Sequence, residues 1–256
     1  MRVPLPDAFL TIPLAHRALH DVAQGRPENS RAAIRAAIAA GYGVEIDLQL
    51  SADGVPMVFH DEMLNRLTPE SGWVKDRTAA ELGLIPLKGG AETIPTLAQV
   101  LDLVAGQVPL LIELKDQTLT MSETDGRLES ATADALKFYD GPVAVMSFNP
   151  HSVAEMARLA PLIPRGLTTS SYDPDDWAPL AIETCAHLRA IPDYDRTSSS
   201  FLSHQANDLA RPRVAELHAN GAALLCWTIK SQADEVAARH IAQNITFEGY
   251  RAAFPA

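Results

Sequence analysis

The chain has 256 residues, 47% of them hydrophobic, and a formal net charge of −11 from 32 acidic and 21 basic side chains. This size can bury a core without metal ions or disulfides, and α/β barrels of roughly 250 residues are often single domains. The acidic balance and the lack of a basic stripe exclude a general nucleic-acid binder and disfavour an anionic membrane surface. A small anionic substrate would therefore need a local cationic pocket.

Targeting and redox signals are weak. The first residues lack the long apolar stretch of a signal peptide, and no apolar run reaches the roughly 20 residues of a membrane span. We therefore expect a cytoplasmic protein without stable membrane insertion. Cys185 and Cys226 lie far apart in apolar segments without metal-type spacing, so two reduced, buried thiols are expected. The sequence leaves the oligomeric state open.

Short apolar runs alternate with longer amphipathic stretches along the chain. The runs predict nine strands: Ile12–Ala15, Gly43–Leu50, Val55–His60, Pro109–Lys115, Val143–Phe148, Arg165–Thr168, His187–Ile191, Ala222–Ile229 and Ile245–Phe247. Helical patterns begin at Pro27-Glu28-Asn29-Ser30 and recur over Thr96–Ala105, His151–Leu159, Asp208–Asn220 and Ser231–His240. Repeated βα units predict a parallel sheet, and this many favour an α/β fold, the closed (β/α)8 TIM barrel.

Nine strands are one too many for this barrel. Ser51-Ala52-Asp53-Gly54 is too short for a helical crossover and is typical of a hairpin turn, so Val55–His60 should fold back on Gly43–Leu50. That pairing brings His60 near Glu45 or Asp47. Residues from about 61 to 95 are irregular and predict a small loop-rich insertion after this third strand segment, within a single domain spanning 1–256. Thr197–Ser200 is expected to be a short polar loop.

Charged residues stand on the predicted strands. Glu45 and Asp47 alternate with apolar residues, so both share one face, and an unpaired buried pair of carboxylates would be costly. A divalent cation removes that conflict, which makes a metal site the favoured interpretation over a solvated edge strand. Glu113 and Lys115 share a face at the end of another apolar strand, where a barrel places its active site. For these two a buried structural salt bridge is nearly as plausible.

Two histidines also end predicted strands. His16 is followed by Arg17, a residue suited to bidentate phosphate contact. His60 is followed by Asp61. A lone histidine is usually structural, but two at strand ends with carboxylates nearby favour a general acid/base pair. Phe148 and Trp227 fall near strand ends and are candidate walls of a substrate pocket, with core packing equally plausible.

Taken together, these segments resemble the glycerophosphodiester phosphodiesterase family of phosphatidylinositol-phospholipase-C-like barrels. The resemblance is carried, in order, by His16-Arg17, Pro27-Glu28-Asn29-Ser30, Val44–Gly54, Val58-Phe59-His60-Asp61 with Leu64-x-Arg66-x-Thr68, Ile94-Pro95-Thr96-Leu97, Ile112-Glu113-Leu114-Lys115 and Trp227-Thr228. The set spans nearly the whole chain.

The resemblance implies roles for these residues. Glu45, Asp47 and Glu113 match the metal ligands, with Mg²⁺ or Ca²⁺ as the usual ion and Mn²⁺ as a third option. His16 and His60 match the general acid/base pair, and Arg17 and Lys115 match the phosphate contacts. The implied reaction is hydrolysis of a small-molecule glycerophosphodiester to sn-glycerol 3-phosphate and an alcohol such as choline or ethanolamine.

The chain departs from the family pattern in three places. Ala18 replaces the usual glycine after His-Arg, where a left-handed backbone would be strained, so a different loop is expected. The family's Trp-Thr-Val-Asn becomes Trp227-Thr228-Ile229-Lys230, and an aspartate-rich strand end becomes Ile245-Thr246-Phe247-Glu248. These departures concern the alcohol group and the fine geometry more than activity.

Two alternatives remain. One is a lysophospholipase D-type phosphodiesterase, which needs an apolar patch for an acyl chain. Residues of the insertion would supply such a patch or form a small core of their own: Trp73, Leu82, Leu84, Ile85 and Leu87. The other is a barrel that binds a phosphodiester without cleaving it, and the intact pair of His16 and His60 argues against that.

Overall fold

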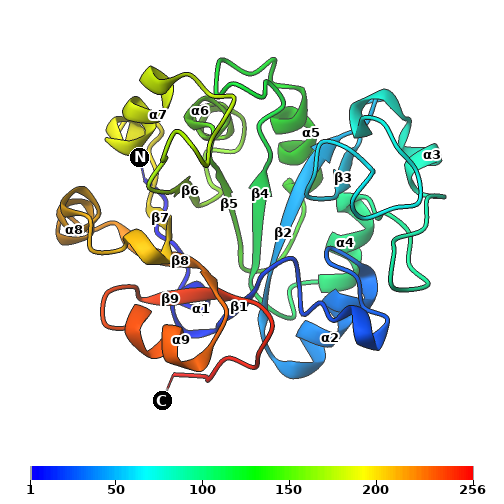
Figure 1. Cartoon of the computed structure of the whole chain (residues 1–256), viewed down its shortest axis with the longest axis horizontal. Coiled ribbons are helices and arrows are strands. Elements are labelled where there is room, and N and C mark those ends of the chain that lie inside the picture. The colour runs from blue at the N-terminus through cyan, green and yellow to red at the C-terminus, as the bar shows by residue number, and fades with distance from the viewer. Residues whose placement is uncertain (1, 256) are drawn as a thin grey trace.

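The computed structural model describes residues 2–255 and shows a closed barrel of eight parallel strands (Figure 1). The barrel follows the order β1-β9-β8-β7-β6-β5-β4-β2, and pairing of β1 with both β9 and β2 closes it. The barrel strands are β1 (Leu14–Ala15), β2 (Gly43–Leu50), β4 (Leu110–Leu114), β5 (Val143–Ser147), β6 (Arg165–Thr169), β7 (Phe201–Gln205), β8 (Ala223–Ile229) and β9 (Asn244–Phe247). The predicted TIM barrel is confirmed.

The remaining strand, β3 (Pro56–Val58), pairs antiparallel with the end of β2, as the Asp53-Gly54 turn predicts. Between β3 and the next barrel helix, the chain forms only η2 (Val74–Asp76), α3 (Ala79–Leu82) and irregular loops. Figure 1 shows this insertion at the right, beside the open end of β2. It has a core of its own, in which Leu82, Ile85 and Leu87 are buried. These residues therefore do not form the exposed patch that an acyl chain would need. Of Leu82, Leu84 and Leu87, Leu84 is the one that is open to solvent.

Helices surround the barrel and bury their apolar faces against the outside of the sheet (Figure 1). α2 shows why they form where they do. Ser30 Oγ accepts a hydrogen bond from the Ala33 N–H at its start, and Gly41 ends it with a left-handed φ of +77°. The helices are α1 (Ala8–Thr11), α2 (Arg31–Ala40), α4 (Leu97–Val104), α5 (Arg127–Leu136), α6 (Pro150–Leu159), α7 (Ile182–Arg189), α8 (Pro212–Ala219) and α9 (Gln232–Ala238), with short 3₁₀ turns η1 (Val22–Gln24), η3 (Pro192–Tyr194) and η4 (Ala206–Asp208).

The barrel interior holds a separate apolar cluster below the site. Phe9 of α1 packs there with Leu14, Leu111 and Phe201. Asn244 Nδ2 donates hydrogen bonds to the carbonyls of Phe9 and Ile12, at 2.8 and 2.7 Å. α1 thereby closes one end of the barrel and leaves the carboxyl ends of the strands as the open end.

One strand prediction was wrong. Residues His187–Ile191 do not form a strand: the segment contains the end of α7, whose Cys185 and Leu188 face the interior. The sixth barrel strand in chain order is instead β7, directly after the predicted polar loop at Thr197–Ser200. β7 was missed because two of its buried residues, Ser203 and His204, are polar and break the apolar pattern. His204 is held by Thr169 Oγ1 at 2.7 Å from its Nδ1.

Within the described residues, no helix is both long and apolar enough to cross a bilayer. Cys185 and Cys226 are both free and buried, as their spacing predicts.

Candidate active site

Three carboxylates meet at the open end of β2 and β4. Glu45 and Asp47 alternate along β2, and Asp47 lies beside Glu113 in the parallel register with β4. All three are buried, and one oxygen of each lies within 4.8 Å of the others. A compact group of buried oxygens of this kind can hold one hard divalent cation.

The three carboxylates repel one another when all of them are charged. Burial, together with the neighbouring carboxylates of Asp47 and Glu113, raises the pKa of Glu45 well above its ordinary value. Burial also opposes ionisation of Asp47, but the nearby His60, Lys115 and Arg17 hold its pKa below the ordinary value. Lys115 Nζ lies 2.8 Å from Glu113 Oε1 and 3.6 Å from Asp47 Oδ1. One lysine therefore balances part of the negative charge but not all of it.

Arg17 is a second cation beside the carboxylates and lies near the other oxygen of Asp47 from Lys115. Its backbone N–H donates to Glu45 Oε2 at 2.8 Å, and its guanidinium is 2.9 Å from Glu28 Oε1. Arg17 Nε is buried without a hydrogen-bond partner among the described residues, 3.6 Å from Asp47 Oδ2. The loop after His16 has a left-handed backbone at Ala18, where φ is +65°. Alanine therefore accepts the strained left-handed backbone at this position, and the expectation of a loop that differs from the family's stays a prediction.

His60 is fixed from two sides. Its Nδ1 lies 2.7 Å from Asp61 Oδ1, and a carboxylate can only accept, so Nδ1 carries a proton. Its Nε2 lies 3.2 Å from Lys115 Nζ, an ammonium that can only donate. Arg66 of the insertion holds Asp61 through two hydrogen bonds of 2.7 Å and also reaches Glu28 at 2.8 and 2.9 Å. The lone pair on Nε2 of His60 is therefore directed toward Lys115.

His16 has a similar arrangement. Its Nδ1 lies 2.5 Å from Glu248 Oε2, just after β9. The nearby His16, His20 and Lys230 hold the pKa of Glu248 well below its ordinary value; Lys230 Nζ is 2.8 Å and His20 Nε2 is 3.6 Å from this carboxylate. Burial lowers the pKa of His16 despite the hydrogen bond with Glu248, which raises it. Each histidine therefore has a carboxylate at Nδ1, and each carboxylate contacts a peripheral cation.

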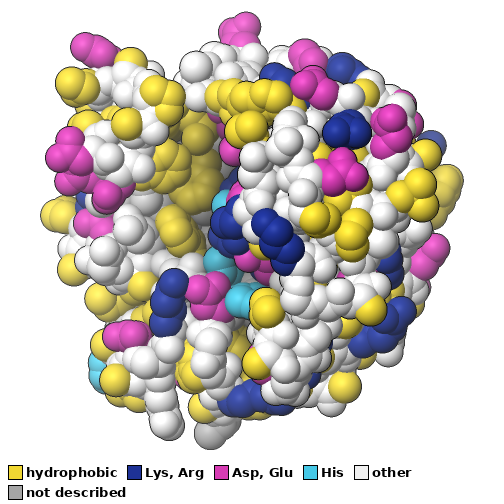
Figure 2. All heavy atoms as spheres, turned by 45° about the vertical axis from the view of Figure 1, so that its right-hand side comes forward, with side chains coloured by type: hydrophobic (Ala, Val, Ile, Leu, Met, Phe, Trp, Pro, Cys, Tyr) yellow, Lys and Arg dark blue, Asp and Glu magenta, His cyan; other side chains and the backbone are white. Residues whose placement is uncertain are grey.

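A cavity of about 270 Å³ joins these groups. It brings together every residue singled out from the sequence as catalytic, phosphate-binding or metal-binding: His16, Arg17, Glu45, Asp47, His60, Glu113 and Lys115. Phe148 and Trp227 form a wall, with ring centroids 5.4 Å apart in an edge-to-face arrangement. Figure 2 shows the hollow, with histidine and charged side chains gathered beside a hydrophobic region.

Sequence reasoning missed several residues of this site. Glu248 and Lys230 appeared only as departures from the family pattern, and His20, which lies 3.6 Å from Glu248, was not singled out. Thr168 and Thr246 also line the cavity, and their hydroxyls are buried without a partner among the described residues. Lone threonines in apolar strands carry no signal in the sequence that separates them from ordinary strand residues.

The fold and the site together define a (β/α)8-barrel enzyme whose polar centre lies at the carboxyl ends of the strands. The model of the glycerophosphoryl diester phosphodiesterase family matches residues 16–246. The chain therefore belongs to this family, as the sequence motifs predict.

Individual proteins of similar sequence carry the name of the same family. The glycerophosphodiester phosphodiesterase of Caldanaerobacter subterraneus subsp. tengcongensis is 32% identical over 165 residues, a match that covers 61% of this chain and 66% of the relative. That of Bacillus altitudinis is 29% identical and covers 80% and 82%.

Solved structures show the same fold. An Oleispira antarctica phosphodiesterase in complex with the product sn-glycerol-3-phosphate has a TM-score of 0.76 at 25% identity, covering 94% of both chains. A glycerophosphodiester phosphodiesterase from Thermotoga maritima has a TM-score of 0.68 at 21% identity, covering 92% and 94%.

Proposed function

We propose that this chain hydrolyses glycerophosphodiesters to sn-glycerol 3-phosphate and an alcohol. One observation carries the proposal: two histidines, three clustered carboxylates and two cations line a single cavity at the open end of the barrel. The product bound to the Oleispira antarctica relative, sn-glycerol-3-phosphate, supports the same substrate class.

The carboxylate group fits a divalent cation. The three ligand oxygens are close together, and burial, followed by the charges of Asp47 and Glu113, raises the pKa of Glu45, a cost of ionisation that a cation would offset. Among the residues lining the cavity, carboxylates outnumber lysine and arginine four to three, so an anionic substrate needs more positive charge. We propose Mg²⁺, Ca²⁺ or Mn²⁺ at Glu45, Asp47 and Glu113, where it would neutralise phosphate charge and polarise the ester.

The two histidines are proposed as the proton-transfer pair. Each is oriented by a carboxylate at Nδ1, which directs Nε2 away from that partner. One removes a proton from the attacking water as its oxygen bonds to phosphorus, and the other gives a proton to the alcohol oxygen as the P–O bond breaks. His16→Ala and His60→Ala should each lower turnover by about 100-fold or more, and near-normal turnover would remove that histidine from the mechanism.

Arg17 and Lys115 are proposed to bind the phosphate. Arg17 Nε, which is buried and has no hydrogen-bond partner among the described residues, lies 3.6 Å from one oxygen of Asp47, and the ammonium of Lys115 lies 3.6 Å from the other. Charge on the phosphate oxygens grows in the transition state, and fixed cations in a desolvated cavity stabilise it. Phe148 and Trp227 would form the wall against which the departing alcohol packs.

The test is release of glycerol 3-phosphate from glycerophosphocholine and glycerophosphoethanolamine with Mg²⁺, Ca²⁺, Mn²⁺ or EDTA. Metal-dependent release is expected. Release that continues in EDTA after exhaustive dialysis would refute the metal assignment. No release with any ion would refute the activity and leave a barrel that binds phosphodiesters.

A further inference from the structure

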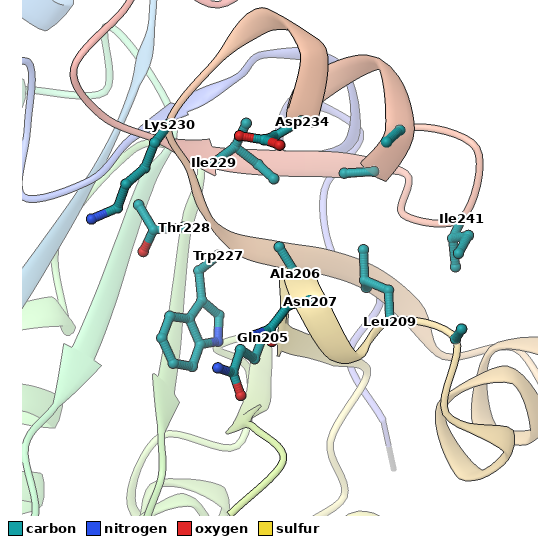
Figure 3. A pocket seen from close by; sticks show the side chains of 13 residues that line it. Gln205, Ala206, Asn207, Leu209, Trp227, Thr228, Ile229, Lys230, Asp234 and Ile241 are labelled. Carbon is teal, nitrogen blue, oxygen red and sulfur yellow. The ribbon is translucent and has the colours of Figure 1, made fainter. Parts of the chain in front are cut away.

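Two glutamines lie across the barrel from the side on which the active-site cavity opens. Trp227, Thr228 and Lys230, at the end of β8, line both this cavity and a groove beside it (Figure 3). β4 lies four strands from β8 in the ring of eight, so the ends of β4 and of its neighbour β2 face β8 across the barrel. Gln49 and Gln117 lie there, at the ends of β2 and β4, and the proposed mechanism gives neither a role.

Gln49 follows the two metal-binding candidates on the inner face of β2. Period-two alternation places Glu45, Asp47 and Gln49 on one face of this strand. Gln49 is 3% exposed and is not among the residues that line the active-site cavity. Its Nε2 donates a hydrogen bond to the His60 carbonyl at 3.1 Å. The amide therefore contacts a catalytic candidate through the backbone, from outside the space that a substrate would occupy.

This hydrogen bond holds a part of the backbone that the sheet leaves free. Pairing of β3 with β2 ends at Val58, and one further hydrogen bond joins the Phe59 N–H to the Asp47 carbonyl at 3.0 Å. Among the described residues, His60 makes no backbone hydrogen bond except the one that its carbonyl accepts from Gln49. The backbone position of His60 therefore depends on this amide.

Gln117 extends the hydrogen bonding to Lys115. Its Nε2 donates to Gln49 Oε1 at 3.0 Å and to the Lys115 carbonyl at 2.9 Å. Its Oε1 accepts from the Leu50 N–H at 3.4 Å. The two amides thus join the backbone of His60 to the backbone of Lys115, and the side chains of these two residues meet at 3.2 Å between Nε2 and Nζ.

Amide side chains suit this position for two reasons. An amide donates and accepts at once, whereas a carboxylate only accepts and an ammonium only donates, so neither charged group could replace Gln49 between its two partners. An amide is also neutral. A carboxylate at this position would add to the negative charge of Asp47, which lies next to Gln49 on the same face of β2.

We propose that Gln49 and Gln117 form an amide bridge that positions His60 against Lys115 for proton transfer. The proposal rests on the proposed function, because the two amides act through His60. Neither glutamine lines the cavity, so both are positioning residues. Gln49 holds the backbone of His60, whereas Asp61 holds its ring through Nδ1.

The first test is Gln49→Met, which keeps the length of the side chain and removes both hydrogen bonds. With glycerophosphocholine and saturating divalent ion, kcat should fall about 10-fold, because a small displacement of a proton-transfer group is costly, and KM should stay within about twofold. Wild-type kcat in this variant would overturn the bridge and leave the proposed function standing. A wild-type chain that does not cleave glycerophosphocholine would overturn both.

Gln107 supplies a matched control. Its amide also donates to backbone carbonyls, those of Leu103 and Val104 at the end of α4. It lies just before β4 begins, at the opposite end of the barrel from the site. Gln107→Met should leave kcat within about twofold of the wild-type value. Equal losses in Gln107→Met and Gln49→Met would overturn a role specific to the bridge.

Two double variants separate positioning of His60 from general damage to the site. In a His60→Ala background the imidazole is absent, so adding Gln49→Met should change the residual kcat by less than about twofold. A further tenfold loss there would show that Gln49 supports Asp47 instead, and would overturn the proposal. Gln117→Met should lower kcat about as much as Gln49→Met, and the two together no more than either alone. Losses that multiply would show that the amides do not act as one bridge.

Discussion

Glu45 is a residue whose charge opposes the stability of the fold. Its carboxylate is buried beside Asp47 and Glu113, and burial and these neighbours raise its pKa well above the ordinary value. Glu45→Gln removes the charge and keeps an oxygen for the Arg17 N–H. We expect the metal-free variant to gain about 1 kcal/mol in free energy of unfolding, or about 2–4 °C in Tm.

The same substitution should abolish metal-dependent turnover, and it should also abolish the rise in Tm that we expect Mg²⁺ or Mn²⁺ to give the wild-type chain. Thermal melts with EDTA and with each ion measure both effects. Glu216→Gln, on the surface beside Arg213, is the control and should change neither. A Glu45→Gln variant that is still stabilised by the ion would remove Glu45 from the ligand set.

We expect Glu248 to act as a positioning residue for His16, and its removal should have a definite pH signature. The hydrogen bond with Glu248 raises the pKa of His16 against the lowering effect of burial. In Glu248→Gln that support is weakened, so the pKa of His16 falls further. The limb of the kcat/KM profile that belongs to His16 should therefore move to lower pH, whether His16 acts as acid or base, and kcat should fall about 10- to 100-fold.

A pH profile measured between about pH 5 and 9 on glycerophosphocholine decides this prediction. A merely structural role for Glu248 would lower the amount of folded enzyme and leave the limb in place. A shift to higher pH would contradict the assignment of Glu248 as the partner of His16.

The sequence predicts the charged residues that line the cavity better than the residues that hold the catalytic candidates in place. Period-two alternation places Glu45 and Asp47 on one face, and it does the same for Glu113 and Lys115. The contact of Glu248 with His16 joins positions 232 residues apart. Nothing local marks Glu248 as more than a polar residue after a short apolar run, so only the closed barrel reveals it.

At the scale of elements, the insertion contributes Arg66, which contacts both Asp61 and Glu28. Asp61 orients His60, and Glu28 holds Arg17. Arg66→Ala frees both carboxylates at once. We expect kcat/KM to fall about tenfold with little loss in Tm, because the side chain is 48% exposed and its ion pairs contribute little to stability.

Arg77 is the matched control, since it lies in the same insertion and pairs with Glu70 at its surface. Arg77→Ala should leave kcat/KM within about twofold of the wild-type value, since surface substitutions usually have small effects. Equal losses in the two variants would indicate a general loosening of the insertion. Normal turnover in Arg66→Ala would show that Asp61 orients His60 without help.

Strand prediction succeeded for β2 and β4 and failed for β7. β2 and β4 are recognised because their outward residues are all apolar. β7 buries Ser203 and His204, and Thr169 of β6 satisfies the histidine, so the apolar signal is absent although the backbone is a strand. The missing strand was assigned to the apolar end of α7. The order of the other strands still predicted the barrel.

For the whole molecule, the net charge of −11 and the cationic side chains of the site act over different distances. At low ionic strength the overall field repels an anionic substrate, and salt above about 0.1 M screens that field beyond about 10 Å. Glycerophosphoglycerol carries a net negative charge, whereas glycerophosphocholine is a zwitterion. Raising salt from about 20 to 200 mM should therefore raise kcat/KM about two- to threefold for the first and leave the second nearly constant.

Both substrates must be assayed at saturating divalent ion, because salt also weakens ion binding to the carboxylates and would lower both rates together. The ratio of the two kcat/KM values cancels that effect. If kcat/KM for glycerophosphoglycerol rises with salt relative to that for glycerophosphocholine, repulsion by the acidic surface limits how fast the anionic substrate reaches the site. A ratio that falls would mean that Arg17, Lys115 and Lys230, at the cavity, already attract the anion from beyond a Debye length. The acidic composition would then have no bearing on which headgroup the enzyme prefers.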